Sequence, residues 1–274
     1  MKVTYEDHMG NDLKVANAAR VSFGKRSEYV FPEDRKPGDV LSAINPKWPM
    51  YLKEADARLI GFLARGCTTG DWEEIISSIA SAGRRAWGGD EQSEEDLMDL
   101  LNELRSMPTH WTPFGHCQIT LIIKAPIFVA RQLFKHKVGS VENEVSRRYV
   151  TDEPEFWTPE EWRAASDDKK QGSGGALDVE MHEYLNEERN HFLKRALGEY
   201  QHKLACGVCP EQARADLPQS MYTEWWVTGS LYYWASLYNA RIRSDAQKET
   251  QQVASMVGDI LSPLYPVAWK ALTQ

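Results

Sequence analysis

The chain has 274 residues, of which 42% are hydrophobic and 26% are charged, fractions that exclude a disordered, collagen-like or coiled-coil protein. Its net charge of −8 disfavours binding of nucleic acid through a broad basic face. Because it has only four cysteines, we expect no disulfide scaffold and a cytoplasmic location. It has no run of about 18 apolar residues and its N-terminus has no apolar core, so we expect neither a membrane span nor a signal peptide.

The first part of the chain is predicted to be mainly helical. We expect a short strand at Met1–Tyr5, a helix at Asp12–Val21, a loop rich in Pro and Gly at Gly24–Pro49, and a helix at Tyr51–Arg65 that Gly66 caps. Two more helices are predicted at Asp71–Ala86 and Ser93–Arg105, with Asp71 and Ser93 as N-caps.

The clearest strand lies at Cys117–Lys124, where apolar and polar residues alternate. Pro126 follows it and favours the first turn of a helix, which ends at the basic triplet Lys135-His136-Lys137. The sequence therefore predicts a strand–helix unit that carries cations at its end.

The C-terminal half is predicted to be helical after an irregular stretch. We expect irregular structure at Asp152–Arg163, a surface loop at Asp167–Gly175, a long amphipathic helix from Met181 to Leu204, a buried helix at Trp225–Ala240, and breaks at Pro218, Ser244 and Pro263. Taken together, these elements predict an α+β fold with a small, mostly antiparallel sheet flanked by long helices in a single domain, residues 1–274.

The stretch Arg131–Tyr149 holds six basic residues, five Lys or Arg and one His, with hydroxyl and amide side chains between them. One interpretation is a solvated helix end followed by a polar loop. The other is a local positive field, supported on a buried strand–helix unit, that attracts an anionic substrate to one place in an acidic protein. Arg214 and Arg241 add guanidinium groups, which suit phosphates and carbonyl oxygens.

Two further motifs are weak. Cys206 and Cys209 have the spacing of a redox or zinc pair, but they have no second Cys or His pair to complete a metal site, so we predict no metal. His110 and His116 are not at the i, i+4 spacing of a helical metal pair.

Several motifs, in the right order, resemble the flavin-dependent thymidylate synthases. Lys135-His136-Lys137 followed by Ser146 is similar to the Arg-His-Arg signature of that family, and Asn143–Tyr149 is similar to the signature's second half. The other similar blocks are Ala18–Phe23, His110–His116, Ala125–Gln132, Glu211–Arg214, Leu217-Pro218 and Arg241–Glu249.

The sequence departs from the family pattern at defined positions. Lysines replace both arginines of the triplet, one residue is added near Glu142, Gly115 replaces a Glu and Asp245 replaces a His. Ser230, Tyr232 and Ser236 stand at positions that face the flavin in many members. Residues 67–107 look like a helical insertion. The resemblance therefore points to a divergent, phage-like member, in the cytoplasm of a bacterium or of a phage-infected host cell.

The resemblance implies an enzyme that methylates dUMP to dTMP. The carbon would come from 5,10-methylenetetrahydrofolate, the hydride from reduced FAD, and NADPH would reduce the flavin. An alternative is a related enzyme that modifies C5 of a pyrimidine nucleotide, such as a hydroxymethylase. A less favoured alternative is a non-catalytic nucleic-acid-binding module.

The resemblance also implies the site residues. Those for dUMP are Gln132, Lys135, Glu144, Ser146, Arg148, Arg214 and Arg241. Those for FAD are Ser22, His110, Thr112, Lys135, His136 and Lys137. Arg241 would be catalytic, as a cation that stabilises negative charge on the pyrimidine ring. A homotetramer with sites shared between subunits is also implied, with no nucleic-acid or membrane partner.

Overall fold

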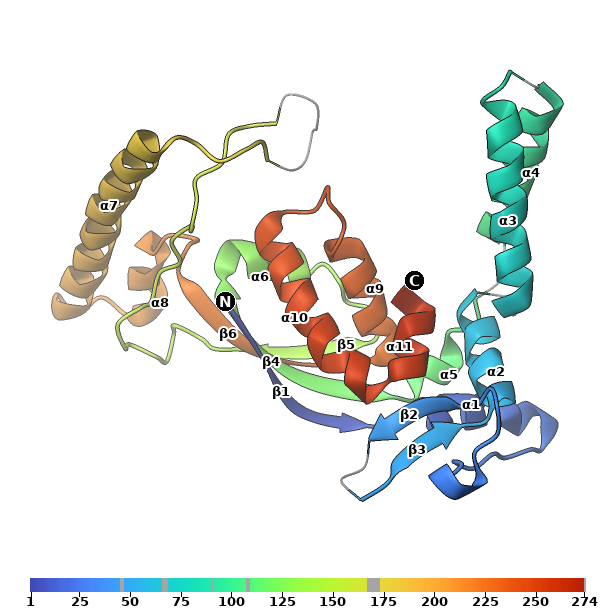
Figure 1. The fold of residues 1–274 in the computed structure, drawn as a ribbon. Coiled ribbons are helices and arrows are strands. Elements are labelled where there is room, and N and C mark those ends of the chain that lie inside the picture. The colour runs from blue at the N-terminus through green and yellow to red at the C-terminus, as the bar shows by residue number, and fades with distance from the viewer. Residues whose placement is uncertain (45–46, 66–68, 90, 107–108, 167–172, 274) are drawn as a thin grey trace. The chain divides into compact units, whose positions relative to one another are not determined.

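The computed structural model describes residues 1–44, 47–65, 69–89, 91–106, 109–166 and 173–273 (Figure 1). The first elements are β1 (Lys2–Met9), α1 (Asp12–Arg20), two 3-10 turns (Val21–Phe23 and Pro32–Asp34), β2 (Val40–Ile44), β3 (Pro49–Leu52), α2 (Glu54–Arg65), α3 (Thr69–Ala86), α4 (Glu91–Ser106) and α5 (Thr112–Gly115). The remaining elements are β4 (Gln118–Pro126), α6 (Ile127–Leu133), β5 (Ser140–Glu144), α7 (Val179–Ala205), α8 (Pro210–Ala213), a 3-10 turn (Arg214–Asp216), β6 (Tyr222–Ser230), α9 (Leu231–Arg241), α10 (Lys248–Leu264) and α11 (Pro266–Thr273).

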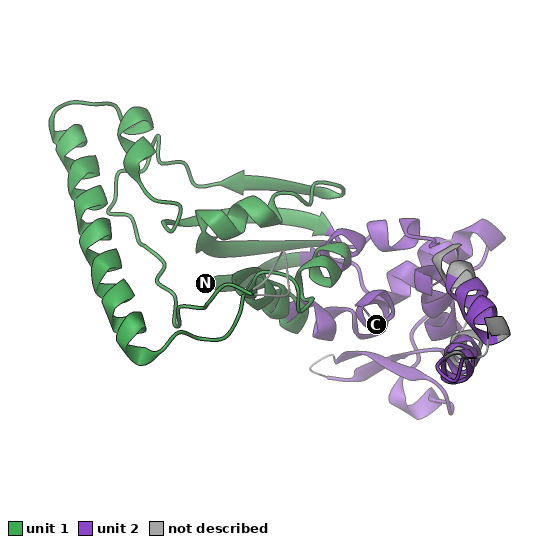
Figure 2. Cartoon of the chain, turned by 90° about the horizontal axis from the view of Figure 1, so that it is seen from above, with its two compact units in different colours: residues 1–7, 119–229, 236–259 green, residues 8–118, 230–235, 260–274 purple. Residues whose placement is uncertain are grey.

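These elements form two compact units, which Figure 2 shows in different colours. Unit 1 comprises residues 1–7, 119–229 and 236–259. Unit 2 comprises residues 8–118, 230–235 and 260–274. That residues 1–274 act as one domain stays a prediction.

The framework of unit 1 is a four-stranded sheet in the order β1–β4–β6–β5. β5 and β6 pair antiparallel, and the hydroxyl groups of Thr120 in β4 and Thr228 in β6 share a hydrogen bond of 2.9 Å. Ile119 and Leu121 of β4 are buried, because alternate side chains of a strand point to the same face. The strand predicted at Cys117–Lys124 is therefore confirmed.

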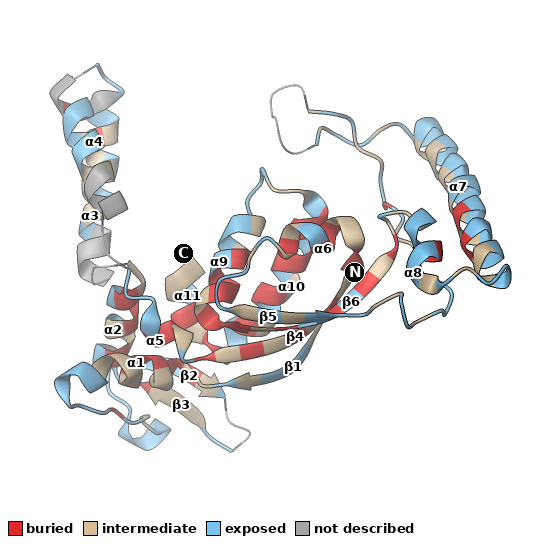
Figure 3. Ribbon diagram, turned by 180° about the vertical axis from the view of Figure 1, so that it is seen from behind, coloured by how far each residue is buried: buried red, intermediate tan, exposed pale blue. Residues whose placement is uncertain are grey.

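Helix α10 lies along this sheet in both Figure 1 and Figure 3. Its residues Val253, Ala254 and Val257 are fully buried, at the spacing that places side chains on one face of a helix. The core of unit 1 therefore lies between the sheet and this helix.

The long helix predicted from Met181 to Leu204 is present as α7. Its N-cap is Asp178, whose carboxylate accepts the backbone N–H of Met181 at 2.8 Å. Near its C-terminal end Tyr200 is buried, whereas Tyr184 and Phe192 are exposed. Only the C-terminal half of the predicted apolar face is therefore buried by the residues that the structure describes.

In unit 2, helices α1, α2, α5 and α11 pack together with the antiparallel β2–β3 hairpin. Asp12, at the start of α1, is fully buried, and its carboxylate accepts the backbone N–H groups of Val267 at 3.1 Å and Ala268 at 2.9 Å. The hydroxyl of Ser42 in β2 donates to the same carboxylate at 2.9 Å. One side chain thus caps α11 and joins it to α1 and β2.

The region predicted as an insertion contains α3 and α4, which pack against each other. Both helices begin two residues before the predicted N-caps Asp71 and Ser93, so these caps are wrong and both residues lie inside helices. The predicted cap Gly66 lies outside the described residues. Just beyond the ends of the insertion, the backbone N–H of His110 donates to the carbonyl of Leu63 at 2.9 Å.

Three predicted elements differ from the structure. The loop predicted at Gly24–Pro49 contains β2 and the start of β3, and the strand predicted at Met1–Tyr5 extends to Met9. The helix predicted at Trp225–Ala240 is wrong for its first part, because residues to Ser230 belong to β6. In β6 the inward Trp225 is 2% exposed and the outward Trp226 is 48% exposed, which is the alternation of a strand.

The α+β fold class with a small antiparallel sheet and long helices is confirmed. Among the described helices, none combines the length and apolar character that a bilayer crossing requires.

Candidate active site

Helix α6 is fixed at its start and delivers the basic triplet at its end. Its first two backbone N–H groups donate to the carbonyls of Met221 and Gln219, which lie just before β6. After α6 ends at Leu133, Lys135 and His136 follow in a hydrogen-bonded turn. The cations predicted at this helix end are therefore held on a support anchored to the sheet.

One cavity in unit 1, of about 880 Å³, gathers four of the predicted dUMP residues. Glu144, Ser146, Arg148 and Arg214 all line it. They come from the end of β5, the loop after it and the turn after α8. The whole lining is Ile127, Ala130, Arg131, Phe134, Glu144, Val145, Ser146, Arg147, Arg148, Glu211, Arg214, Ala215, Leu217, Gln219, Met221, Tyr222 and Thr223.

Several polar side chains of this cavity are held in place by hydrogen bonds to neighbouring groups. The hydroxyl of Thr223 donates to Glu144 at 2.6 Å, so this carboxylate is fixed in orientation. The guanidinium of Arg148 donates to the Ser146 hydroxyl at 3.2 Å, and Arg214 donates to the carbonyl of Glu211 at 3.4 Å. A hydroxyl and guanidinium groups around one cavity are suited to a phosphate, and a carboxylate beside them is suited to a sugar hydroxyl.

A second cluster in unit 1 is centred on Arg241, which ends α9. Its Nε donates to Nε2 of His136 at 3.1 Å, and its Nη2 donates to the backbone carbonyl of Gln132 at 2.9 Å. Because Arg241 Nε can only donate, Nε2 of His136 is the acceptor in this bond. Burial and the neighbouring guanidinium lower the pKa of His136, which favours the neutral ring. Gln132, Lys135 and Arg241 are not part of the cavity lining, so the predicted dUMP residues fall into two groups.

The predicted FAD residues are distributed over both units. Lys135 and Lys137 are exposed after α6, and Lys137 pairs with Glu142 and lies 5.3 Å from the centre of the Phe134 ring. In unit 2, Ser22, His110 and Thr112 are also exposed. His110 stacks on Phe62 with ring centres 5.6 Å apart.

Three cysteines lie among the described residues, and they differ in burial. Burial raises the pKa of Cys117 to about 12, so it stays a neutral thiol. Cys206 and Cys209 are exposed, and Cys206 lies 3.6 Å from His202. Within the described ranges, no group of three or more His, Cys, Asp or Glu is placed to hold a metal ion.

The structure adds residues that were not among the predicted site residues. Arg131, Arg147 and Glu211 line the cavity. Gln247 and Glu249 connect to Gln132 through hydrogen bonds. Arg131 and Arg147 lie in the basic stretch, and Gln247 and Glu249 lie in a block that resembles the family. Neither the charge pattern nor the resemblance indicates which side chains turn toward the site.

Comparison of the chain with known proteins identifies its family. The family model described as "Thymidylate synthase complementing protein" matches residues 6–267. A flavin-dependent thymidylate synthase of Thermus thermophilus is 36% identical over 204 residues, which are 72% of this chain and 71% of that protein. That of Wolbachia pipientis wMel is 31% identical over 207 residues, 74% and 72% of the two chains.

The fold is also found in a solved structure. A UMP/dUMP methylase, PolB from Streptomyces cacaoi, bound with 5-Br dUMP, matches with a TM-score of 0.66 and covers 99% of this chain and 94% of that one. The sequence identity is 24%, so this similarity shows the fold.

Proposed function

The chain belongs to the family of thymidylate synthase complementing proteins, and on this premise we propose that it methylates dUMP to dTMP as a flavin-dependent thymidylate synthase. The observation that carries the proposal is the cavity of about 880 Å³ lined by Glu144, Ser146, Arg148 and Arg214. In it Ser146, Arg148 and Arg214 bind the phosphate, and Glu144 accepts a hydrogen bond from the sugar.

Arg241 is the catalytic cation of this proposal. Uracil C5 is a weak nucleophile, and negative charge that develops on the ring is stabilised by a guanidinium already held in place. His136 and the Gln132 carbonyl hold that guanidinium at two of its nitrogens. Cys117 is a buried thiol with a raised pKa and is unsuited to addition to C6.

The predicted FAD residues fit the chemistry of a dinucleotide. Lys135 and Lys137 are exposed cations suited to a pyrophosphate, and Ser22, His110 and Thr112 add hydroxyl and ring groups at the surface of unit 2. Unit 2 also exposes the rings of Phe23 and Trp111, on which a flat ring system can stack. Bound FAD would supply the hydride, 5,10-methylenetetrahydrofolate the carbon, and NADPH the reducing equivalents.

A homotetramer with shared sites completes the proposal. Within one chain, Gln132, Lys135 and Arg241 are not among the residues that line the cavity with the other predicted dUMP residues. If a neighbouring subunit supplies one of the two groups, all the predicted dUMP residues meet at one nucleotide. We place the enzyme in the cytoplasm and regard residues 67–107 as a helical insertion.

The proposal is tested by the absorption spectrum and turnover of the purified protein. We expect a yellow protein whose NADPH oxidation accelerates when dUMP is added in the presence of methylenetetrahydrofolate. The product mass must correspond to added methyl rather than hydroxymethyl. Protein that neither retains nor binds FAD, and leaves dUMP unchanged, would contradict the proposal.

A further inference from the structure

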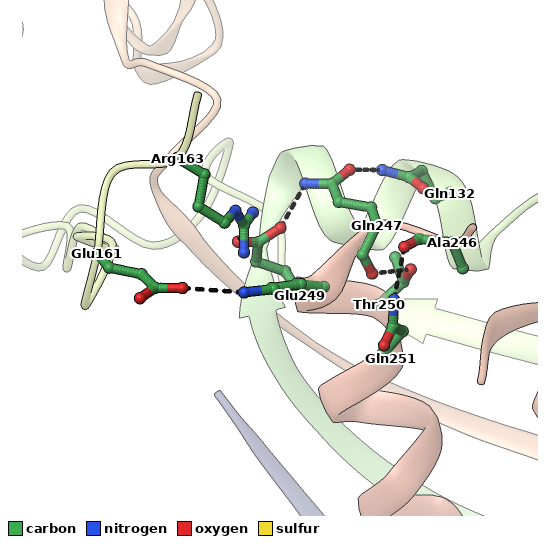
Figure 4. A network of polar contacts seen from close by, with 9 residues as sticks. Gln132, Glu161, Arg163, Ala246, Gln247, Glu249, Thr250 and Gln251 are labelled. Atoms are coloured by element: carbon green, nitrogen blue, oxygen red, sulfur yellow. Dashed lines mark hydrogen bonds and ion pairs between the residues drawn. The ribbon is translucent and has the colours of Figure 1, made fainter. Parts of the chain in front are cut away.

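A chain of polar side chains leads from the segment after β5 to Gln132 (Figure 4). Arg163 donates to one carboxylate oxygen of Glu249 at 2.7 Å, and Gln247 donates its amide to the other at 2.7 Å. Gln132 in turn donates its amide to the carbonyl oxygen of Gln247. We call these four residues, Arg163, Glu249, Gln247 and Gln132, the amide relay.

The direction of the amide relay follows from its buried end. The Glu249 side chain is 6% exposed and forms an ion pair with Arg163 at 2.7 Å, so its carboxylate oxygens act as hydrogen-bond acceptors. Gln247 must therefore turn its NH₂ group toward Glu249 and its carbonyl oxygen toward Gln132. The orientation of both amides is set by one charged pair.

The backbone of Gln247 is fixed as well. Its carbonyl accepts the backbone N–H of Thr250 at 2.9 Å and the hydroxyl of Thr250 at 2.7 Å, at the start of α10. Gln247 is itself half-buried, which limits the rotamers open to it. The relay thus links α6 to α10, two elements whose sequence separation exceeds 100 residues, through one side chain held at both ends.

We propose that Gln247 is a positioning residue that, held by the Arg163–Glu249 pair, fixes the side chain of Gln132 for binding of the pyrimidine nucleotide. The inference rests on the proposed function, in which Gln132 contacts dUMP. Gln132 held in one orientation loses less side-chain entropy when the nucleotide binds. Gln247 does not touch the nucleotide, so its contribution passes entirely through Gln132.

The test is a double-mutant cycle on dUMP binding to the full-length holoenzyme, measured by calorimetry with dUMP itself as probe. We expect Gln132→Ala to weaken binding about tenfold and Gln247→Ala about fivefold. In the Gln132→Ala background, Gln247→Ala changes the affinity less than about twofold, because the residue it acts on is absent. Steady-state kinetics should show the Gln247→Ala effect in KM, with kcat nearly unchanged.

The matched control is Glu161→Gln. Glu161 makes an exposed ion pair with Lys248, the residue next to Gln247, at 2.9 Å and takes no part in the amide relay. This variant should bind dUMP like the wild type. Glu249→Gln is a second variant that disturbs the amide relay, because a neutral amide no longer dictates the orientation of Gln247. It should weaken dUMP binding in the wild-type background. It should leave the dUMP affinity of the Gln247→Ala variant unchanged.

Each result decides the inference. If Gln247→Ala weakens dUMP binding equally in both backgrounds, or has no effect in the wild type, positioning through Gln132 is wrong while the proposed function stands. A Gln132→Ala variant that binds dUMP normally overturns the inference in the same way. A wild-type protein that does not bind dUMP overturns the proposed function, and the inference with it.

Discussion

At the scale of single residues, Arg241 is held from two directions, by a side chain and by a backbone carbonyl. Its bonds to His136 and to the Gln132 carbonyl fix the guanidinium before any ligand arrives. A group that is already in place stabilises charge in the transition state without reorganisation. For Arg241→Ala we predict a fall in kcat of about 100-fold or more, with dUMP affinity weakened less than about fivefold.

The control for this prediction is Arg243→Ala. Arg243 lies two residues away, is exposed and pairs with Asp245 at 3.0 Å, so its loss removes the same charge outside the cluster. Turnover should then stay near that of the wild type. Unchanged turnover in Arg241→Ala itself would show that the ring-activation role is assigned to the wrong residue.

His136 should give the protein a defined pH dependence. Burial, and to a smaller extent the charge of Arg241, lower the pKa of His136 below its ordinary value of 6.5. At pH values between the folded and the unfolded pKa, the unfolded chain therefore binds more protons than the folded chain. The contribution to stability is fully present above pH 6.5 and is lost as the pH falls through the folded pKa. We predict that the unfolding free energy of the wild type, minus that of His136→Gln, decreases from pH 8 to pH 5 in urea titrations. If this difference in unfolding free energy stays constant or increases as the pH falls, the assigned role of His136 is wrong.

At the scale of elements, the cap of α11 depends on a carboxylate rather than an amide. Both oxygens of Asp12 accept hydrogen bonds, from Val267 and Ser42 on one and from Ala268 on the other. In Asp12→Asn one oxygen becomes an NH₂ donor that faces another donor. We predict a loss of about 1–3 kcal/mol in unfolding free energy, measured by urea denaturation.

Asp178→Asn is the matched control, because the α7 cap uses a single carboxylate oxygen to accept one backbone N–H. Asn is about as good as Asp at such a position. This variant should therefore change the unfolding free energy little. Equal losses in the two variants would show that the second oxygen of Asp12 contributes nothing.

The α3–α4 pair is the element whose removal should matter least for nucleotide binding. The two helices pack on each other, and the Leu63–His110 hydrogen bond brings together the chain on either side of them. A short linker in place of residues 67–107 therefore closes a small gap at low entropic cost. We predict that this deletion variant stays folded, by circular dichroism, and binds dUMP within about threefold of the wild type. Loss of dUMP binding in a folded variant would show that the segment is part of the site.

Sequence patterns predicted some elements and failed on others for physical reasons. In β4 the alternation is clean and a proline ends it, so strand and helix were both predicted. In β6 the strand passes into α9 directly at Leu231, and the stretch Trp225–Ala240 that spans the junction has no charged residue, so it resembles one buried helix. The site residues close together in sequence, such as Glu144 and Ser146, were predicted from a motif. The Arg163–Glu249 pair was not, because its members are 86 positions apart and only the fold brings them together.

At the scale of the whole molecule, the division of the predicted dUMP residues into two groups leads to a prediction about assembly. Arg214 lines the cavity, and Arg241 belongs to the cluster with His136 outside that lining. If a site takes the cavity from one subunit and the Arg241 cluster from another, one inactive chain can complement another. If each site lies within one chain, it cannot.

The test combines Arg214→Ala and Arg241→Ala chains, co-expressed with different tags and purified through both. Each variant alone should have little activity, since one lacks a proposed phosphate-binding arginine and the other lacks the proposed catalytic cation. With random mixing, a site receives both native arginines in about a quarter of cases, so the mixed oligomer should recover about a quarter of wild-type turnover. Two differently tagged copies of the same variant serve as the control. A mixed oligomer no more active than that control would show that the site forms within a single subunit.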